Sequence, residues 1–96
     1  PPFSRLIAII ISANSHSLSL DGAREIKKHL KKINEIEVLG PVDSPLLKIK
    51  KKFRSRLLIR FNGKSLIQKK IAKLLNNLKI SSKIKLTVDV DPVNFG

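Results

Sequence analysis

The stretch from Leu46 to Phe61, LLKIKKKFRSRLLIRF, constrains the fold more than any other part of this chain. Successive side chains of an extended strand point to opposite faces of its sheet. One face would hold Lys50, Lys52, Arg54, Arg56, Leu58 and Arg60, and the other would hold Lys51, Phe53, Ser55, Leu57, Ile59 and Phe61. The second face turns apolar after Ser55, so it is expected to meet a core. The pattern predicts a strand near residues 53–61 in a sheet with one buried face and one basic face.

The remaining segments alternate between the period of a strand and the period of a helix. Residues 5–12 form a continuous β-branched run, which is typical of a central strand, and residues 35–39 and 83–90 alternate like shorter strands. Residues 19–33 and 63–78 repeat apolar positions three and four apart, which predicts amphipathic helices. We expect Ser17 or Ser19 to cap the first helix and Asn62 the second. The segment 40–45, GPVDSP, is predicted to interrupt regular structure.

The order strand, helix, strand, strand, helix, strand matches the split βαβ plan, also called ferredoxin-like. This α+β, βαββαβ arrangement has four strands in one sheet, both helices on one face, and pairing between the first and third strands. Ninety-six residues suffice for one domain with one modest core, so residues 1–96 are expected to be a single domain. Because the chain contains no Met, we expect it to be part of a longer polypeptide.

The charge balance predicts a polyanionic partner. The chain has 20 Lys and Arg against 7 Asp and Glu, a net charge of +13, and nucleic acid is the partner that most often neutralises such an excess. A membrane surface fits less well, because the chain has no Trp and no separate amphipathic arm. The candidate nucleic-acid-binding residues are Lys50, Lys52, Arg54, Arg56, Arg60, Lys83 and Lys85. The alternative is that the cations of the basic strand only protect a sheet edge from wrong pairing.

No residue pattern indicates catalysis or a cofactor. There is no Cys and no phosphate-binding GxxxxGK[ST] loop, and His16 and His29 lack metal-ligand partners at useful spacing. Arg5 and Asn62 resemble the residue pair of small acyl-phosphate hydrolases only in type, since no glycine-rich cradle precedes the first helix. Asp89 and Asp91 share a strand face, and we expect them to form ion pairs with Lys83 and Lys85; the alternative is a divalent-ion site or a paired-carboxylate acid/base. The chain is therefore expected to be no enzyme and to hold no metal or cofactor.

Three short pieces, in order, resemble a known family. They are Pro1-Pro2-Phe3 before the first strand, Leu39-Gly40-Pro41 followed by KKFRSRLLIR, and VDVDPVNF at the end. Together they resemble the C-terminal domain of primosomal protein N′, the PriA family of bacterial replication-restart DNA helicases. Lys52, Phe53 and Arg54 match the basic-aromatic-basic signature of the family, Arg60 matches a basic or polar position, and Asp89, Asp91 and Pro92 match its closing motif. The chain departs from the family at Lys51, where Gly is frequent, and at Ser55, where a second aromatic residue is frequent.

The resemblance implies a cytoplasmic, monomeric module attached to an ATP-dependent 3′–5′ helicase core. Such a module helps to hold forked or single-stranded DNA and contacts the acidic, Phe-ending tail of single-stranded-DNA-binding protein. The family receives that tail near Gln68, and Lys64 stands where the family tends to place Arg. Lys64 and Gln68 are therefore the candidate partner-binding residues. The alternative function is a stand-alone ribosomal-type RNA-binding domain of similar fold.

Overall fold

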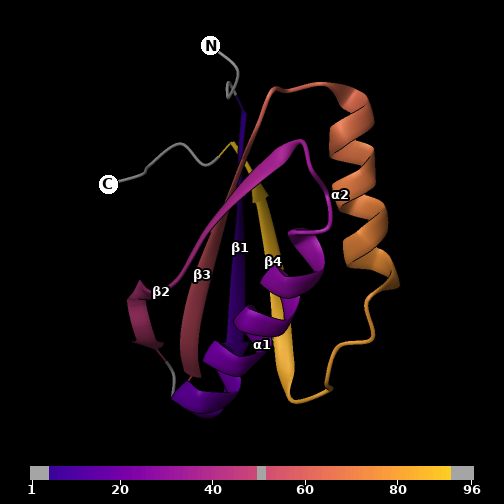
Figure 1. Cartoon of the computed structure of the whole chain (residues 1–96). Coiled ribbons are helices and arrows are strands. Elements are labelled where there is room, and N and C mark those ends of the chain that lie inside the picture. Colours follow the sequence, from indigo (N-terminus) through magenta and orange to yellow (C-terminus); the bar gives the residue numbers. More distant parts are fainter. Residues whose placement is uncertain (1–4, 50–51, 92–96) are drawn as a thin grey trace.

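The computed structural model describes residues 5–49 and 52–91. Its elements follow the predicted order: β1 (Arg5–Ala13), α1 (His16–Leu30), β2 (Ile36–Ile49), β3 (Lys52–Phe61), α2 (Ser65–Asn77) and β4 (Ile84–Val90) (Figure 1). The four strands form one sheet in the order β2-β3-β1-β4, and every neighbouring pair is antiparallel. The predicted ferredoxin-like plan is thus confirmed, with β1 in a central position and paired with β3.

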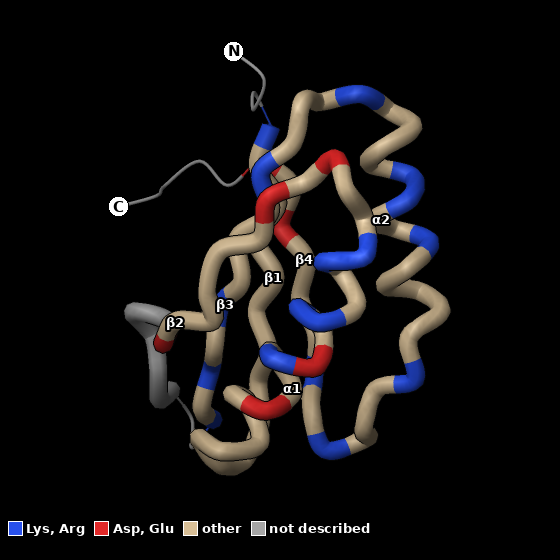
Figure 2. Tube along the Cα trace, viewed as in Figure 1, with Lys and Arg blue, Asp and Glu red and all other residues tan. Residues whose placement is uncertain are grey.

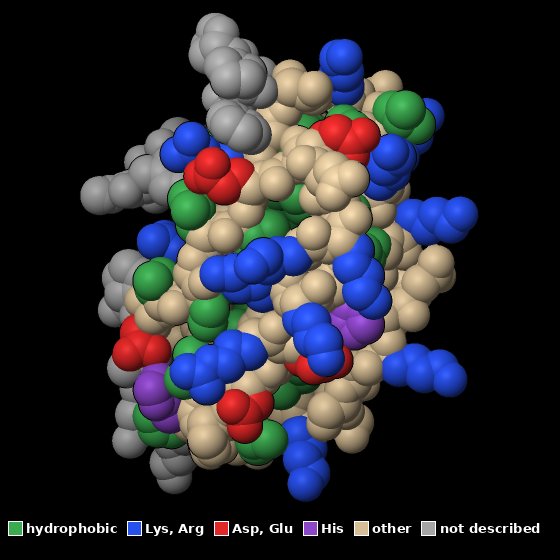
Figure 3. Space-filling model, viewed as in Figure 1, with side chains coloured by type: hydrophobic (Ala, Val, Ile, Leu, Met, Phe, Trp, Pro, Cys, Tyr) green, Lys and Arg blue, Asp and Glu red, His purple; other side chains and the backbone are tan. Residues whose placement is uncertain are grey.

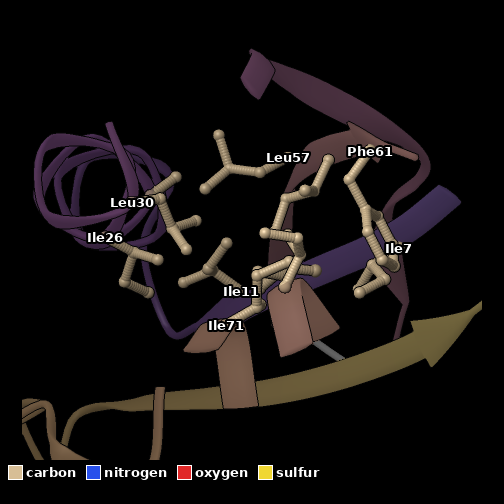
Figure 4. Packing of buried hydrophobic residues seen from close by; sticks show 11 residues of the cluster. Ile7, Ile11, Ile26, Leu30, Leu57, Phe61 and Ile71 are labelled. Atoms are coloured by element: carbon tan, nitrogen blue, oxygen red, sulfur yellow. The ribbon is translucent and has the colours of Figure 1, made fainter. Parts of the chain in front are cut away.

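Both helices cover the same face of the sheet (Figure 1). The core between them and the sheet is formed by alternate residues of the two central strands, namely Ile7, Ile9, Ile11, Leu57, Ile59 and Phe61, and by helical residues that include Ala23, Ile26, Leu30, Ile67 and Ile71 (Figure 4). The inward residues of β3 are those that the two-residue period predicts. In the part of the chain that the structure describes, no helix lies on the opposite face of the sheet, and we call it the open face.

Helix α1 starts three residues before its predicted first residue. Ser15 caps it, because the Ser15 hydroxyl accepts a hydrogen bond from the backbone N–H of Leu18 at 3.2 Å. The predicted caps, Ser17 and Ser19, were therefore wrong. Ser19 is fully buried, and its hydroxyl lies 3.0 Å from that of Ser55 and donates to the His16 carbonyl at 3.0 Å. Ser19 is thus a buried residue in the first turns of α1, and its hydroxyl is not available to cap the helix.

Strand β2 is much longer than residues 35–39, and the predicted break at 40–45 was wrong. The strand continues to Ile49 through two shifts of register against β3, between Leu39 and Val42 and between Asp43 and Lys48. A β-bulge leaves extra residues of one strand without a partner on the neighbouring strand, so pairing can resume after them. Gly40 makes the first shift possible, since its φ is +103° and an added Cβ would lie 2.7 Å from the Arg56 carbonyl oxygen. Turn-forming residues here bend a strand and do not end it.

The second helix and the last strand also differ from prediction. Asn62 does not cap α2: its Oδ1 accepts from the backbone N–H of Lys64 at 2.9 Å, and the helix begins at Ser65. On β4, Ile84 and Leu86 pack against the core, whereas Val88 and Val90 on the same side are 47% and 41% exposed. The helical layer therefore covers only the first half of this edge strand.

Candidate nucleic-acid interface

Strand register places most of the predicted cations at one end of the open face. Arg54 is opposite Ser12, and Ser12 is opposite Lys85, so one row across three strands holds two cations; the next row holds Arg56, Ile10 and Thr87. Strands lie about 4.8 Å apart, so Arg54 and Lys85 start about 10 Å from each other. We call Lys52, Arg54, Arg56 and Lys85 the basic end of the open face. Figure 2 shows Lys and Arg positions along the lower parts of β3 and β4.

The side chains of the basic end differ in exposure. Lys52 and Lys85 are exposed, and Arg54 and Arg56 are half-buried. Lys52 Nζ donates to Asn14 Oδ1 at 2.7 Å, which anchors its amine beside the start of α1. Lys83 lies just before β4 and is also exposed, and Lys50 lies outside the described residues. This combination suits contacts to phosphate, because an Arg guanidinium can bind a phosphate through two nitrogen atoms and a flexible Lys amine adds a point charge beside it.

The open face is not basic along its whole length. Arg60 lies toward the other end, where its Nε is 3.5 Å from Oε1 of Glu37 on β2. Between the two ends, a row across the sheet places Leu39, Leu58, Ala8 and Asp89 side by side. The predicted ladder therefore divides into the basic end and a separate, acid-paired Arg60.

Cations alone do not distinguish the basic end, since the helical face also carries many Lys and Arg side chains (Figure 3). On the helical face, however, acidic side chains are interspersed: Arg24 faces Asp21 at 3.8 Å, and Lys70 faces Glu35 at 3.4 Å. In the described parts of the two rows that contain Arg54 and Arg56, no Asp or Glu occurs. At the paired positions of these two rows, the basic end thus presents Lys and Arg together with neutral residues.

Asp91 has a structural partner that the sequence analysis missed. Its carboxylate forms an ion pair with Arg5 and accepts a hydrogen bond from the backbone N–H of Leu6 at 3.0 Å. The backbone N–H of Asp91 donates to the Leu6 carbonyl at 2.6 Å. Among the described residues, neither Asp89 nor Asp91 pairs with Lys83 or Lys85, so that prediction was wrong. Asp91 fastens the end of β4 to the start of β1.

His16 lies in a contact that no sequence pattern indicated. Its Nε2 is 2.7 Å from Oδ1 of Asp43, and its ring is 6.3 Å from the ring of Phe53, tilted by 49°. Asp43 reaches α1 only because β2 continues past Gly40, so the contact could not be expected from a chain that turns there. The contact with His16 of α1 shows that Phe53 faces the helical side of the sheet, as predicted, and not the open face. Within the described part of the chain, no group of three His, Asp or Glu is placed to hold a metal ion.

The two predicted partner-binding residues do not line the same surface feature. A shallow depression on α2, with a volume of about 350 Å³, is lined by Ser65, Gln68, Lys69 and Ala72. Gln68 lies there, but Lys64 belongs to the exposed turn before the helix. Lys69, which helical periodicity places opposite the apolar stripe, lines this depression together with Gln68.

Among the described helices, none has the length and hydropathy needed to cross a membrane.

Comparison with known structures supports the fold. A de novo designed protein, Foldit4, superimposes with a TM-score of 0.65, at 16% sequence identity, over 94% of this chain and 98% of its own. An identity this low shows a shared architecture alone.

Comparison with known sequences shows the relationship. The family model described as the primosomal protein N C-terminal domain matches residues 1–93. Replication restart protein PriA of Rickettsia conorii is 37% identical over 99% of this chain, that of Rickettsia prowazekii 38% over 99%, and that of Borreliella burgdorferi 27% over 99%. The chain spans only 14% to 15% of the length of these relatives. With the family model and the relatives in agreement over nearly all of its length, the chain belongs to the family of C-terminal domains of the replication restart protein PriA.

Proposed function

We propose that this domain binds forked or single-stranded DNA through the basic end of its open face, as the cytoplasmic C-terminal part of a replication-restart helicase. The observation that carries the proposal is the strand register, which brings Arg54, Arg56 and Lys85 together on one face of the sheet. Phosphate contacts of this kind supply affinity and orientation without reading sequence. Family membership favours DNA over the alternative, a ribosomal-type RNA.

The salt dependence of binding tests this proposal. Four phosphate contacts from Lys52, Arg54, Arg56 and Lys85 predict a slope of log K against log salt of about −2.8 for single-stranded DNA, at about 0.7 per contact. Replacing Arg54 and Arg56 together by Ala is expected to reduce the slope by about 1.4 and to weaken binding to all sequences alike. The measurement is fluorescence anisotropy with a labelled oligonucleotide over a range of salt concentrations.

A matched control removes the same charge elsewhere. Lys31 and Lys32 follow α1 and are both exposed, so the Lys31→Ala, Lys32→Ala double variant lowers net charge equally without touching the open face. It is expected to leave the slope unchanged. Equal slopes for both double variants would place the DNA site on another surface, and tighter binding of an RNA strand of the same sequence would favour the ribosomal-type alternative.

We also propose that the depression on α2 receives the acidic tail of single-stranded-DNA-binding protein. Gln68 lines the depression with Lys69, and Lys64 lies one helical turn before Gln68, since the Gln68 N–H donates to the Lys64 carbonyl at 3.1 Å. We expect the terminal carboxylate of the tail to bind near the Gln68 side-chain amide, where Lys64 and Lys69 each offer an ammonium group. A Lys at either point supplies one charge and no bidentate fork.

Titration with a labelled peptide of that tail, at fixed low salt, tests the second proposal. Lys64→Glu and Lys69→Glu are each expected to weaken binding by about 1 to 2 kcal/mol, because they place a negative charge beside the carboxylate. Lys31→Glu makes the same charge change on the exposed end of α1 and is expected to have little effect. Equal losses in all three variants would show only the effect of net charge and would contradict a site on α2.

A further inference from the structure

A second surface feature lies apart from both the open face and the depression on α2. It is a groove of about 520 Å³ between α1 and the segment that joins α2 to β4. Its floor and walls include the apolar side chains of Leu18, Ile26, Leu78, Ile80 and Ile84. Pockets that hold small ligands or side chains of a partner have volumes of about 300 to 1,000 Å³, so the groove is large enough to take apolar groups.

The groove has a structural cause. Helix α1 approaches β4 closely at Gly22, where an added Cβ would lie 2.9 Å from Cδ1 of Ile84 and 3.3 Å from Cγ2 of Ile11. Helix α2 ends at Asn77, and Leu78 already has an extended backbone. The non-helical segment from Leu78 to Ser81 therefore forms the side of the groove opposite α1, and Figure 1 shows this segment joining α2 to β4.

Charge decides what such a groove can hold. Asp21 and Glu25 lie one turn apart on the α1 wall, and their side chains are 73% and 64% exposed. Their local partners are exposed pairs of little strength: Arg24 is 3.8 Å from Asp21, and His29 is 3.2 Å from Glu25. Two of the seven acidic residues of a chain with net charge +13 thus border one apolar groove. A phosphate backbone is disfavoured beside these carboxylates, whereas a cationic side chain is attracted to them.

We propose that this groove is a docking site for a partner peptide that inserts apolar side chains and places a Lys or Arg against Asp21 and Glu25. The apolar floor supplies most of the burial, and the carboxylates set orientation and reject acidic segments. Lys79, which lines the groove on the segment between α2 and β4, also orients the peptide, because it repels the cationic end of the peptide. The preference for a cationic peptide separates this site from the proposed site for an acidic tail on α2.

The test uses two short amphipathic peptides of identical apolar face, one with Leu and Lys and the other with Leu and Glu. The net charge of +13 attracts the Glu peptide to every part of the surface, so preference for the Lys peptide can arise only from a local acidic site. In nitrogen-15 NMR spectra of the 96-residue chain, the Lys peptide is expected to shift the backbone signals of Gly22, Ser81 and Ile84.

Matched variants localise the effect. The double variant Asp21→Lys, Glu25→Lys is expected to weaken the Lys peptide at least about tenfold. Glu35→Lys, Glu37→Lys makes the same charge change outside the groove and is expected to leave affinity within about twofold. Ile80→Asp, in the groove, is expected to abolish binding, whereas Leu66→Asp, on the exposed side of α2, is expected to retain it.

Several results would overturn the proposal. Tighter binding of the Glu peptide, equal losses in the two double variants, or peptide shifts confined to the open face would each exclude a cation-selective groove. Shifts at Gly22, Ser81 and Ile84 on addition of single-stranded DNA alone would assign the groove to nucleic acid instead. None of these results depends on whether the basic end binds DNA.

Discussion

Replacement of Asp91 tests whether the closing motif of the family has a structural role in this chain. Asp91 has a φ of +51°, forms an ion pair with Arg5, and accepts from the Leu6 N–H at 3.0 Å. In Asp91→Ala we expect a loss of about 1 kcal/mol for the hydrogen bond. The exposed ion pair adds about 0.5 kcal/mol, and the left-handed backbone, which Asp tolerates better than Ala, adds about 1 kcal/mol. The free energy of unfolding should therefore fall by about 2.5 kcal/mol.

Other substitutions at Asp91 separate these contributions. Asp91→Asn keeps an acceptor for the Leu6 N–H and the tolerance for positive φ, so we expect a loss of only about 0.5 kcal/mol, which high salt should abolish. Asp91→Gly relieves the backbone but loses both side-chain contacts, and its stability should lie between those of Asn and Ala. Asp89→Ala is the control, since Asp89 is exposed on the same strand; it should change stability by less than about 0.5 kcal/mol.

Urea denaturation at two salt concentrations and thermal unfolding give these values. For a domain of this size, 2.5 kcal/mol corresponds to a fall in Tm of about 10 to 20 °C. An Asp91→Ala variant as stable as the wild type would refute the structural role. A rise in wild-type Tm with Mg²⁺ that Asp91→Asn abolishes would instead assign the aspartates to a divalent ion.

Three further predictions test the core and the bulge by urea denaturation. Gly40→Ala should lower the free energy of unfolding by about 3 kcal/mol, because it combines positive φ with a Cβ 2.7 Å from the Arg56 carbonyl oxygen; an unchanged stability would mean that β2 does not bulge at Gly40. Ile11→Val should cost about 1 kcal/mol at a fully buried position, whereas Ile10→Val on the open face should cost less, and equal costs would contradict the assignment of faces. Ser19→Ala should cost more than Ser55→Ala, since the Ser19 hydroxyl donates to the His16 carbonyl and must accept from Ser55, so its removal leaves a buried donor unpaired; the reverse order would refute this direction of the bond.

Periodicity predicted the fold because the apolar residues that recur with the period of a strand or a helix are the same residues that pack in the core. The inward residues of β3, from Ser55 to Phe61, and the apolar stripe of α2 through Ile67 and Ile71 follow directly from periods of two and 3.6. The element order then left few arrangements, and the central β1 followed from its uninterrupted β-branched run. These features depend on local spacing, which a sequence displays.

The missed features depend on contacts between segments distant in sequence. Gly40 and Pro41 have the local chemistry of a turn, and only pairing with β3 shows that they belong to a bulged strand. Ser15 and Ser19 are equally good caps by residue type, and Ser19 is excluded as a cap because its hydroxyl meets Ser55 in the core. The contact of His16 with Asp43 depends in turn on the bulged strand. In each case the deciding contact joins two segments that are distant in sequence.

The position of the candidate sites shows why net charge predicts a class of partner but not a binding surface. A charge of +13 applies to the whole chain, and Lys and Arg side chains occur on the helical face (Figure 3) as well as on the open face. Register separates them: Arg60 is placed across from Glu37, whereas Arg54 is placed in a row with Ser12 and Lys85. A shift of β3 by one residue would turn its cations into the core. Asp21 and Glu25 lie instead on α1, beside an apolar groove whose lining includes Ile84, the neighbour of Lys85 on β4. Successive residues of a strand point to opposite faces, so Ile84 and Lys85 belong to opposite faces of the sheet. The net charge carries no information about this separation, and it therefore cannot distinguish the two proposed sites.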